Sequence, residues 1–319
     1  MKKKIKPYLY APKNISNIIF VSGNTRSGKA LLMKIIASFN GIEKGNVDFL
    51  MEQANYLSST KVIKKEAAIY FLRKAFSILD YNLRIGRNVN FRKNDYTSVY
   101  EYRDPKKYFR NLRSKEGNRI IKILKKEKNI IPLLVHNGLS TTNLFDAFDN
   151  FKIIEMKRNP ISTIFSWINK GYGGEFYDSY RTVALTYRYK KKIIPYYAFG
   201  WEEKYLKLNK YERIVEMFLR LENQKEKTLG ILSRKSKKNI FYLKLEDLHI
   251  NPLDIIIRLE KILKKKKTKY TIKLLRKEHL PRKIDLEEIN IKKDFLKKKL
   301  SSIYFKKLLL LEKKYLKKN

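Results

Sequence analysis

Short apolar runs alternate along the chain with longer stretches that have helical periodicity. Residues 17–22, 130–135 and 151–156 are typical of buried strands, and residues 239–245 form a fourth candidate strand. Strands that alternate with helices favour a parallel sheet that helices cover on both faces. We therefore expect a three-layer α/β/α domain with a central parallel sheet, whose ligands bind at the carboxyl ends of the strands.

The predicted helices follow the strands closely. Residues 29–39 and 66–83 are amphipathic, and residues 252–263 form a helix with Pro252 near its start. Between them, residues 85–102 are polar, aromatic and irregular, which indicates an ordered loop. We expect one domain over residues 1–319, in which the lysine-rich amphipathic helices of residues 264–319 close or extend it.

The composition is strongly basic. The 319 residues include 73 Lys and Arg against 31 Asp and Glu, a formal net charge of +42. Such a charge is typical of proteins that bind nucleic acid or anionic membranes, which is one alternative for this chain. However, the lysines are spread along the whole sequence, and no zinc finger, basic zipper or RNA-binding aromatic motif is present. We expect solvated lysine faces, no specific nucleic acid partner, and at most peripheral contact with an anionic surface.

Cysteine is absent and histidine occurs three times, which excludes disulfides, thiolate nucleophiles and cysteine metal sites. No apolar run approaches the roughly 18 to 20 residues that span a membrane. We expect a cytoplasmic protein. The sequence gives no indication of its oligomeric state.

A phosphate-binding loop is predicted directly after the first strand. Gly23-Asn24-Thr25-Arg26-Ser27-Gly28-Lys29 fits the pattern G-x-x-x-x-G-K, in which backbone N–H groups, a helix N-terminus and a lysine bind phosphate. The next position holds Mg²⁺ through a Ser or Thr hydroxyl in nucleotide triphosphatases, but here it is Ala30. A P-loop kinase or NTPase that acts on a small molecule is therefore a second alternative.

The same loop, extended to Leu32, resembles the G-x-x-R-S-G-T-T-L-L loop of sulfotransferases. Arg158-Asn159-Pro160, followed by Ser166, resembles the R-[DN]-P-x-x-x-x-x-S element with which that family binds the 3′-phosphate of its nucleotide. The segment from Leu245 to Pro252 resembles the family's Y-E-D-L-x-x-x-P segment, with Leu245 in place of the tyrosine. The three matches occur in the family's order.

This resemblance to sulfotransferases implies an enzyme with a P-loop-like fold. It would move a sulfuryl group from 3′-phosphoadenosine 5′-phosphosulfate to a hydroxyl group of an acceptor, without a metal. The residues that the resemblance assigns to the nucleotide are Gly23, Thr25, Arg26, Ser27, Gly28, Lys29, Ala30, Arg158 and Ser166. Arg282 and Lys283 in a C-terminal loop are further candidates to contact the nucleotide.

Two residues are candidates for the base that activates the acceptor hydroxyl. His136 follows the strand where cytosolic sulfotransferases carry their catalytic histidine, whereas Golgi-type relatives place a glutamate in the segment that contains Glu52. Both alternatives stay open at this point. Lys29, with Arg26, is the candidate to stabilise charge on the phosphosulfate and on the leaving group.

Composition alone bears on the acceptor. Cations in residues 84–92 and aromatic faces at Trp167 and Trp201 would suit a sugar, and a carbohydrate or glycan hydroxyl is the expected acceptor.

Overall fold

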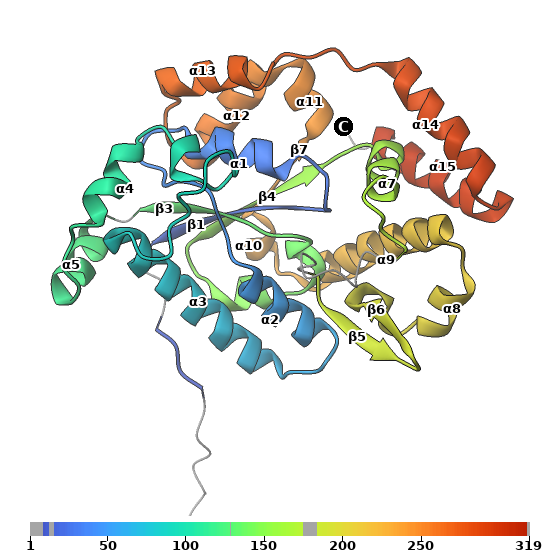
Figure 1. Cartoon of the computed structure of the whole chain (residues 1–319), viewed down its shortest axis with the longest axis horizontal. Helices are drawn as coiled ribbons and strands as arrows, with labels where there is room; N and C mark the ends of the chain where they lie inside the picture. Colours follow the sequence, from blue (N-terminus) through green and yellow to red (C-terminus); the bar gives the residue numbers. More distant parts are fainter. Residues whose placement is uncertain (1–8, 13–15, 128, 175–183, 318–319) are drawn as a thin grey trace, which may run out of the picture.

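A five-stranded parallel sheet with the order β2-β3-β1-β4-β7 forms the centre of the computed structural model, which describes residues 9–12, 16–127, 129–174 and 184–317 (Figure 1). The strands are β1 Asn17–Gly23, β2 Asn46–Val47, β3 Ile130–Leu134, β4 Phe151–Lys157 and β7 Ile240–Lys244. In register, Phe20 of β1 lies between Leu133 of β3 and Ile153 of β4. This parallel sheet between layers of helices confirms the expected α/β/α class.

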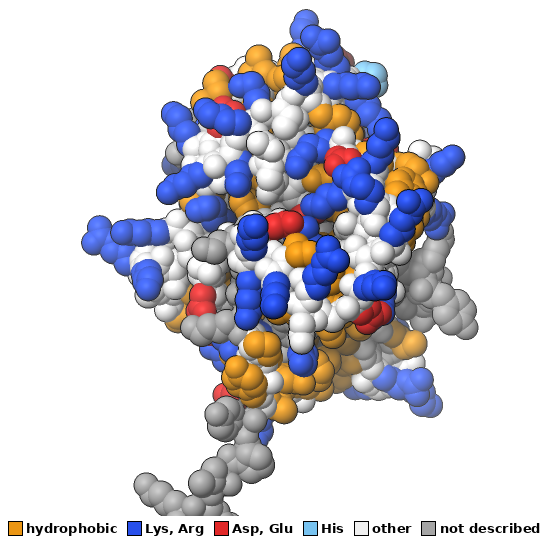
Figure 2. All heavy atoms as spheres, turned by 90° about the vertical axis from the view of Figure 1, so that its left-hand side faces the viewer, with side chains coloured by type: hydrophobic (Ala, Val, Ile, Leu, Met, Phe, Trp, Pro, Cys, Tyr) orange, Lys and Arg blue, Asp and Glu red, His pale blue; other side chains and the backbone are white. Residues whose placement is uncertain are grey.

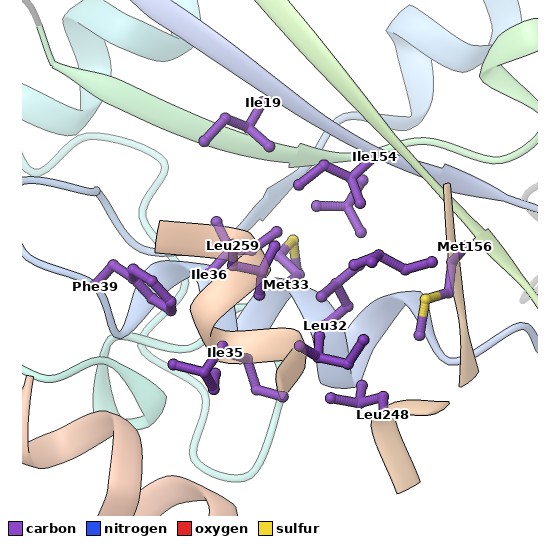
Figure 3. Packing of buried hydrophobic residues seen from close by; sticks show 14 of the residues in the cluster. Ile19, Leu32, Met33, Ile35, Ile36, Phe39, Ile154, Met156, Leu248 and Leu259 are labelled. Carbon is purple, nitrogen blue, oxygen red and sulfur yellow. The ribbon is translucent and has the colours of Figure 1, made fainter. Parts of the chain in front are cut away.

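One face of the sheet is covered by helices from both ends of the chain. These are α1 Lys29–Ala37, α11 Leu245–Ile250, α12 Pro252–Leu263 and α13 Lys269–Lys277. Ile19 and Ile154 of the sheet pack with Leu32 of α1 and Leu259 of α12 in one buried cluster (Figure 3). Because side chains alternate along a strand, the residues next to these in β1 and β4 face the opposite layer.

The opposite face packs against the middle of the chain. Phe20 and Ile153 lie in a second buried cluster with Phe76 of α3 and Tyr108 of α4. The elements of this layer and its edge are α2 Phe49–Ser59, α3 Lys65–Ile85, η1 Val99–Glu101, α4 Pro105–Asn111, α5 Asn118–Glu127, η2 Gly138–Ser140 and α6 Asn143–Ala147.

A third cluster lies beyond the carboxyl ends of β1 and β4. Trp167, Phe218, Leu296 and Leu308 join four helices there, namely α7 Pro160–Ile168, α9 Lys210–Ile231, α14 Leu286–Lys299 and α15 Ser302–Lys317. Beside α9 lie the antiparallel hairpin of β5 Thr186–Tyr189 and β6 Lys192–Pro195, then η4 Tyr196–Ala198 and α8 Glu202–Lys207, and α10 Arg234–Lys237 precedes β7.

The strands predicted from the sequence agree with the structure to within about two residues, and α12 has the predicted bounds. Residues 85–102 are largely irregular, as expected, apart from η1. The lysine-rich C-terminal residues form α13, α14 and α15, of which the last two pack on α7 and α9. That residues 1–319 constitute a single domain stays a prediction.

Basic side chains are dispersed over one face of the molecule. Figure 2 shows Lys and Arg side chains scattered over most of the face that carries α4 and α5, with only a few acidic groups among them. Within the described residues, no helix is both long and apolar enough to cross a membrane.

Candidate active site

The loop between β1 and α1 depends on two glycines. Gly23 has φ +143° and Gly28 has φ +90°, in the region that L side chains rarely adopt. A Cβ atom at Gly23 would lie 2.4 Å from the carbonyl oxygen of Met156, and one at Gly28 would lie 2.5 Å from Cδ1 of Leu245. The loop therefore lies directly against the carboxyl ends of β4 and β7, which is where the sheet topology predicts a ligand site.

The residues of this loop fit a phosphate group. No side chain caps the N-terminus of α1, and its first turn carries no acidic residue, so its backbone N–H groups and its dipole favour an anion. The hydroxyl of Ser27 is buried and has no hydrogen-bond partner in the part of the chain that the structure describes. Ala30, in the same turn of α1, offers no side-chain oxygen to a metal ion.

Lys29 lies buried beneath the loop, with 3% of the residue exposed. Its Nζ donates to the carbonyl oxygens of Gly23 at 3.0 Å and of Asn24 at 2.6 Å. Burial lowers the pKa of the Lys29 ammonium to about 7, although the carboxylates of Glu52 and Glu155 raise it. The Lys29 side chain therefore lies within the loop and titrates near pH 7.

Arg26, Arg158 and Ser166 meet on the outer side of the loop. Arg158 follows β4 and donates from Nη1 to the carbonyl oxygen of Arg26 at 2.9 Å, while Nε of Arg26 donates to Oγ of Ser166 at 3.0 Å. The pKa of Arg158 is lowered, first by burial and also by the like charge of Arg26, although the carboxylate of Glu246 raises it. Two guanidinium groups that repel each other beside a hydroxyl would be stabilised by an anion.

Glu246 holds this arrangement to the rest of the fold. Its Oε1 accepts the backbone N–H of Asn159 at 2.9 Å, and Oε2 accepts the hydroxyl of Tyr315 in α15. Asn159 in turn caps α7, because its Oδ1 accepts the N–H groups of Ile161 and Ser162. The segment that begins at Leu245 therefore fixes the position of the helix that carries Ser166.

His136 and Glu52, the two alternatives for the base, form a pair. Oε1 of Glu52 lies 2.9 Å from Nδ1 of His136 and accepts the backbone N–H of the same residue at 2.8 Å. Burial and the charge of Lys29 hold the pKa of His136 below its ordinary value, although the carboxylate of Glu52 raises it. The neutral imidazole therefore carries its proton on Nδ1, toward Glu52, and Nε2 is left as the basic nitrogen. In this geometry the histidine can accept a proton and the glutamate can orient it.

A cavity of about 100 Å³ adjoins this pair and the loop, and we call it the inner pocket. His136, Glu52 and Thr25 line it together with aromatic side chains. Trp167 contributes to its wall and is fixed by a hydrogen bond of 2.7 Å from Nε1 to the carbonyl oxygen of Thr25. A molecule in the inner pocket would lie between the predicted base and the phosphate loop.

Sequence reasoning missed a buried ion cluster under the loop. Nζ of Lys225 in α9 lies 2.6 Å from Glu155 of β4 and 2.9 Å from Glu222. Glu222 also accepts a hydrogen bond of 2.9 Å from the Asn24 side chain. The signal was a glutamate inside an apolar strand, since a buried charge requires a partner.

Tyr56 and Tyr196 were also missed. Their rings stack with centroids 4.0 Å apart in the wall of the inner pocket. They belong to α2 and η4, which the hydrophobic pattern does not bring together, and we find no sequence signal for them.

The remaining residues predicted from the sequence lie partly near the site and partly at structural positions away from it. Trp201 lines a groove outside the inner pocket. Arg84 of the basic 84–92 segment is buried, and its ion pair with Glu127 at 2.8 Å gives it a structural role. Arg282 donates from its backbone to the carbonyl oxygen of His249 and lowers the pKa of that histidine, as Arg158 does, so it lies in the same region as Arg158.

No model of a known protein family matches the chain, and no curated protein matches it. Among solved structures, it is similar to the sulfotransferase domain from the curacin biosynthetic pathway, with 12% identity over 86% of this chain and 80% of that chain and a TM-score of 0.42. The sulfotransferase domain of the Synechococcus PCC 7002 olefin synthase matches with 12% identity over 98% of this chain and all of that chain (100%), with a TM-score of 0.44. A sulfotransferase from Mycobacterium tuberculosis matches with 8% identity, 88% and 76% coverage and a TM-score of 0.41.

These matched structures are sulfotransferases, the class that the sequence motifs resemble. At these TM-scores the matches carry no weight for the substrate or for the role of any residue.

Proposed function

We propose that this protein transfers a sulfuryl group from 3′-phosphoadenosine 5′-phosphosulfate to a hydroxyl group of an acceptor. The observation that supports it best is the meeting of Arg158, Arg26 and Ser166 beside the phosphate loop. An ordinary NTPase has no 3′-phosphate to bind, whereas this donor carries one together with its 5′-phosphosulfate. The phosphate loop would bind one phosphate position of this nucleotide and Arg158 with Ser166 the other, while Arg26 lies between them.

The residues of the loop and its outer side would hold the donor. The N-terminus of α1, Ser27 and Lys29 would hold the 5′-phosphosulfate, and Arg158 and Ser166 the 3′-phosphate. When bound, the donor supplies the sulfuryl group: the acceptor oxygen bonds to sulfur as the bond from sulfur to the 5′-phosphate oxygen breaks, and that phosphate keeps the electron pair.

The chain's own residues would move one proton and stabilise charge. His136 would take the hydroxyl proton on Nε2, while Glu52 holds the ring and balances the imidazolium that forms. Lys29 and Arg26 would stabilise the negative charge that builds on the 5′-phosphate. Glu52 and His136 then act as one unit, in which the histidine is the base and the glutamate positions it.

The finer features of this proposal stay predictions. They are a carbohydrate acceptor, independence from metal ions, and a cytoplasmic location. Within the described residues, no group of three His, Asp or Glu side chains gathers that could hold a metal ion.

The test is a calorimetric titration of the full chain with 3′-phosphoadenosine 5′-phosphate and, separately, with ADP, both without Mg²⁺. These ligands differ in where the second phosphate lies. We expect the 3′,5′-bisphosphate to bind at least about tenfold more tightly, since charge-assisted hydrogen bonds contribute about 1.5 to 3 kcal/mol. A preference for ADP would instead favour the P-loop kinase alternative, and binding of neither would overturn the proposal.

A further inference from the structure

The inner pocket is small and mostly aromatic. Its volume of about 100 Å³ suits a single six-membered ring, and Tyr56, Tyr196 and Trp167 contribute to its wall. The polar atoms of two of these side chains already have partners: the Tyr56 hydroxyl donates to the carbonyl oxygen of His136 at 3.2 Å, and Nε1 of Trp167 donates to that of Thr25. The walls therefore present ring faces more than hydrogen-bonding groups.

Polar groups form the smaller part of the lining. They are the imidazole of His136, the carboxylate of Glu52, the hydroxyl groups of Thr25 and the tyrosines, and the amide of Asn137, whose buried Oδ1 has no hydrogen-bond partner in the described part of the chain. A sugar ring would bring several hydroxyl groups into this space, and each one that stays unpaired costs about 1 to 3 kcal/mol. A flat, largely apolar ring with one hydroxyl group avoids that cost and gains by stacking on the tyrosine pair.

A larger groove adjoins the inner pocket, and we call it the outer groove. Its volume is about 530 Å³, and it shares Tyr196, Tyr197 and Leu221 with the inner pocket. Trp201 lines the groove, and the guanidinium of Arg220 lies 4.6 Å from its ring centroid. A ring that enters the inner pocket would thus leave the remainder of its molecule in the outer groove.

The outer groove is cationic. Arg220, Lys227 and Lys307 line it, and the acidic residue in its lining is Glu216. Glu216 already lies 2.9 Å from Arg220, 2.9 Å from Lys204 and 3.7 Å from Lys307, so these cations outnumber it. An anionic group in the groove would be attracted by this excess of positive charge.

We propose that the acceptor is an elongated anionic molecule that carries its hydroxyl group on a flat, largely apolar ring. The ring occupies the inner pocket, with its hydroxyl at His136, and a carboxylate or phosphate at the other end lies near Arg220, Lys227 and Lys307. This inference rests on the proposed sulfuryl transfer and specifies its acceptor class. It is an alternative to the carbohydrate acceptor, which stays a prediction from composition.

The test compares matched acceptors at a fixed concentration of 3′-phosphoadenosine 5′-phosphosulfate, with the full chain. The probes are 4-propylphenol, 4-(4-hydroxyphenyl)butanoate and methyl glucoside, and the readout is kcat/KM from the release of 3′-phosphoadenosine 5′-phosphate. We expect the anionic phenol to be preferred over the neutral phenol by about tenfold, and the sugar to react more slowly than both.

Variants test which residues attract the anionic end of the acceptor. Changing Lys227 and Lys307 together to Gln should lower the ratio of kcat/KM between the anionic and the neutral phenol about three- to tenfold. The matched control, Lys313→Gln, removes a lysine from the exposed surface of α15 and should leave that ratio unchanged.

The outcomes separate this inference from the proposed function. If the sugar reacts faster than the phenols, or if neither phenol reacts although the 3′,5′-bisphosphate binds more tightly than ADP, the acceptor class is wrong and the sulfotransferase proposal stands. Equal kcat/KM for the two phenols overturns the role of the outer groove. If the bisphosphate is not preferred over ADP, both proposals fail.

Discussion

Glu52 holds His136 at two points, because Oε1 accepts the backbone N–H at 2.8 Å and lies 2.9 Å from the ring Nδ1. Glu52 belongs to the first turn of α2, and His136 follows the end of β3. The sequence predicts the two residues as alternatives for one role, but in this chain the two side chains form a single hydrogen-bonded unit. A glutamate that binds both the backbone and the ring fixes the tautomer as well as the direction of the imidazole.

This pair predicts distinct effects for its two members. His136→Gln should lower kcat by about 10²- to 10⁴-fold, because it would remove the proposed general base. Glu52→Gln should lower kcat at least about tenfold, and it should shift the acidic limb of the pH–rate profile to lower pH, because the carboxylate raises the pKa of His136. Activity should be lost as the pH falls through the pKa of His136, which burial places below its ordinary value. The measurement is kcat against pH for each variant.

Glu66→Gln is the matched control for that experiment, since Glu66 is exposed in the first turn of α3. It should leave both kcat and the acidic limb unchanged. If Glu52→Gln lowers kcat without moving the acidic limb, the glutamate acts on the structure and not on the titration of His136.

Arg158 predicts a selective effect on the nucleotide. Arg158→Ala should weaken the binding of 3′-phosphoadenosine 5′-phosphate by about 10- to 100-fold, because it would remove a charge-assisted contact that contributes about 1.5 to 3 kcal/mol. ADP, which has no 3′-phosphate, should lose much less affinity. The measurement is calorimetric titration of both ligands, with Arg276→Ala on the exposed side of α13 as the control. An equal loss for both ligands would contradict the assignment of Arg158 to the 3′-phosphate.

Much of the fold could be predicted because its signals are local. Apolar runs such as 151–156 show where buried strands lie, and Gly23 and Gly28 show where the chain must adopt φ values that other residues avoid. The parallel arrangement then brings the ends of β1, β3 and β4 to one edge of the sheet. For that reason the sequence alone could associate Lys29, His136 and Arg158 with one site.

The remainder depends on contacts between distant segments. The pairing of Glu52 with His136 joins residues 84 positions apart, and the stack of Tyr56 on Tyr196 joins α2 to η4. Lys225 lies in an amphipathic helix where a lysine would ordinarily be solvated, and only the packing of α9 against β4 brings it to Glu155. No local periodicity encodes such contacts, so the roles within the site required the structure.

Lys29 predicts that nucleotide binding depends on pH. In the free protein the pKa of Lys29 is about 7, because burial disfavours the ammonium. Phosphate groups in the loop would raise that pKa, so binding should take up a proton above pH 7, and affinity should fall as the pH rises from 7 to 9. The measurement is calorimetry with 3′-phosphoadenosine 5′-phosphate at pH 8 in two buffers of different ionisation enthalpy.

Lys29→Met should abolish this proton uptake and weaken nucleotide binding by about 10- to 100-fold, as expected for a lost charge-assisted hydrogen bond. Lys313→Met on α15 is the control and should retain the proton uptake and the nucleotide affinity. Proton uptake that persists in Lys29→Met would assign the titration to another group.

Replacing Gly28 should destabilise the protein through two effects that can be separated, backbone strain and a steric contact. Gly28→Ala should lower the free energy of unfolding by about 1 to 3 kcal/mol, because alanine is strained at φ +90° and its Cβ would lie 2.5 Å from Cδ1 of Leu245. In a double-mutant cycle with Leu245→Ala, the contact part should disappear and the backbone part should remain, so the loss from Gly28→Ala should be smaller in that background. Gly230→Ala near the end of α9 is the control, since a Cβ there meets nothing within 4 Å, and it should stabilise the protein by up to about 1 kcal/mol. Urea denaturation of the four variants measures these differences, and an undiminished loss in the Leu245→Ala background would show that backbone strain alone requires glycine in the phosphate loop.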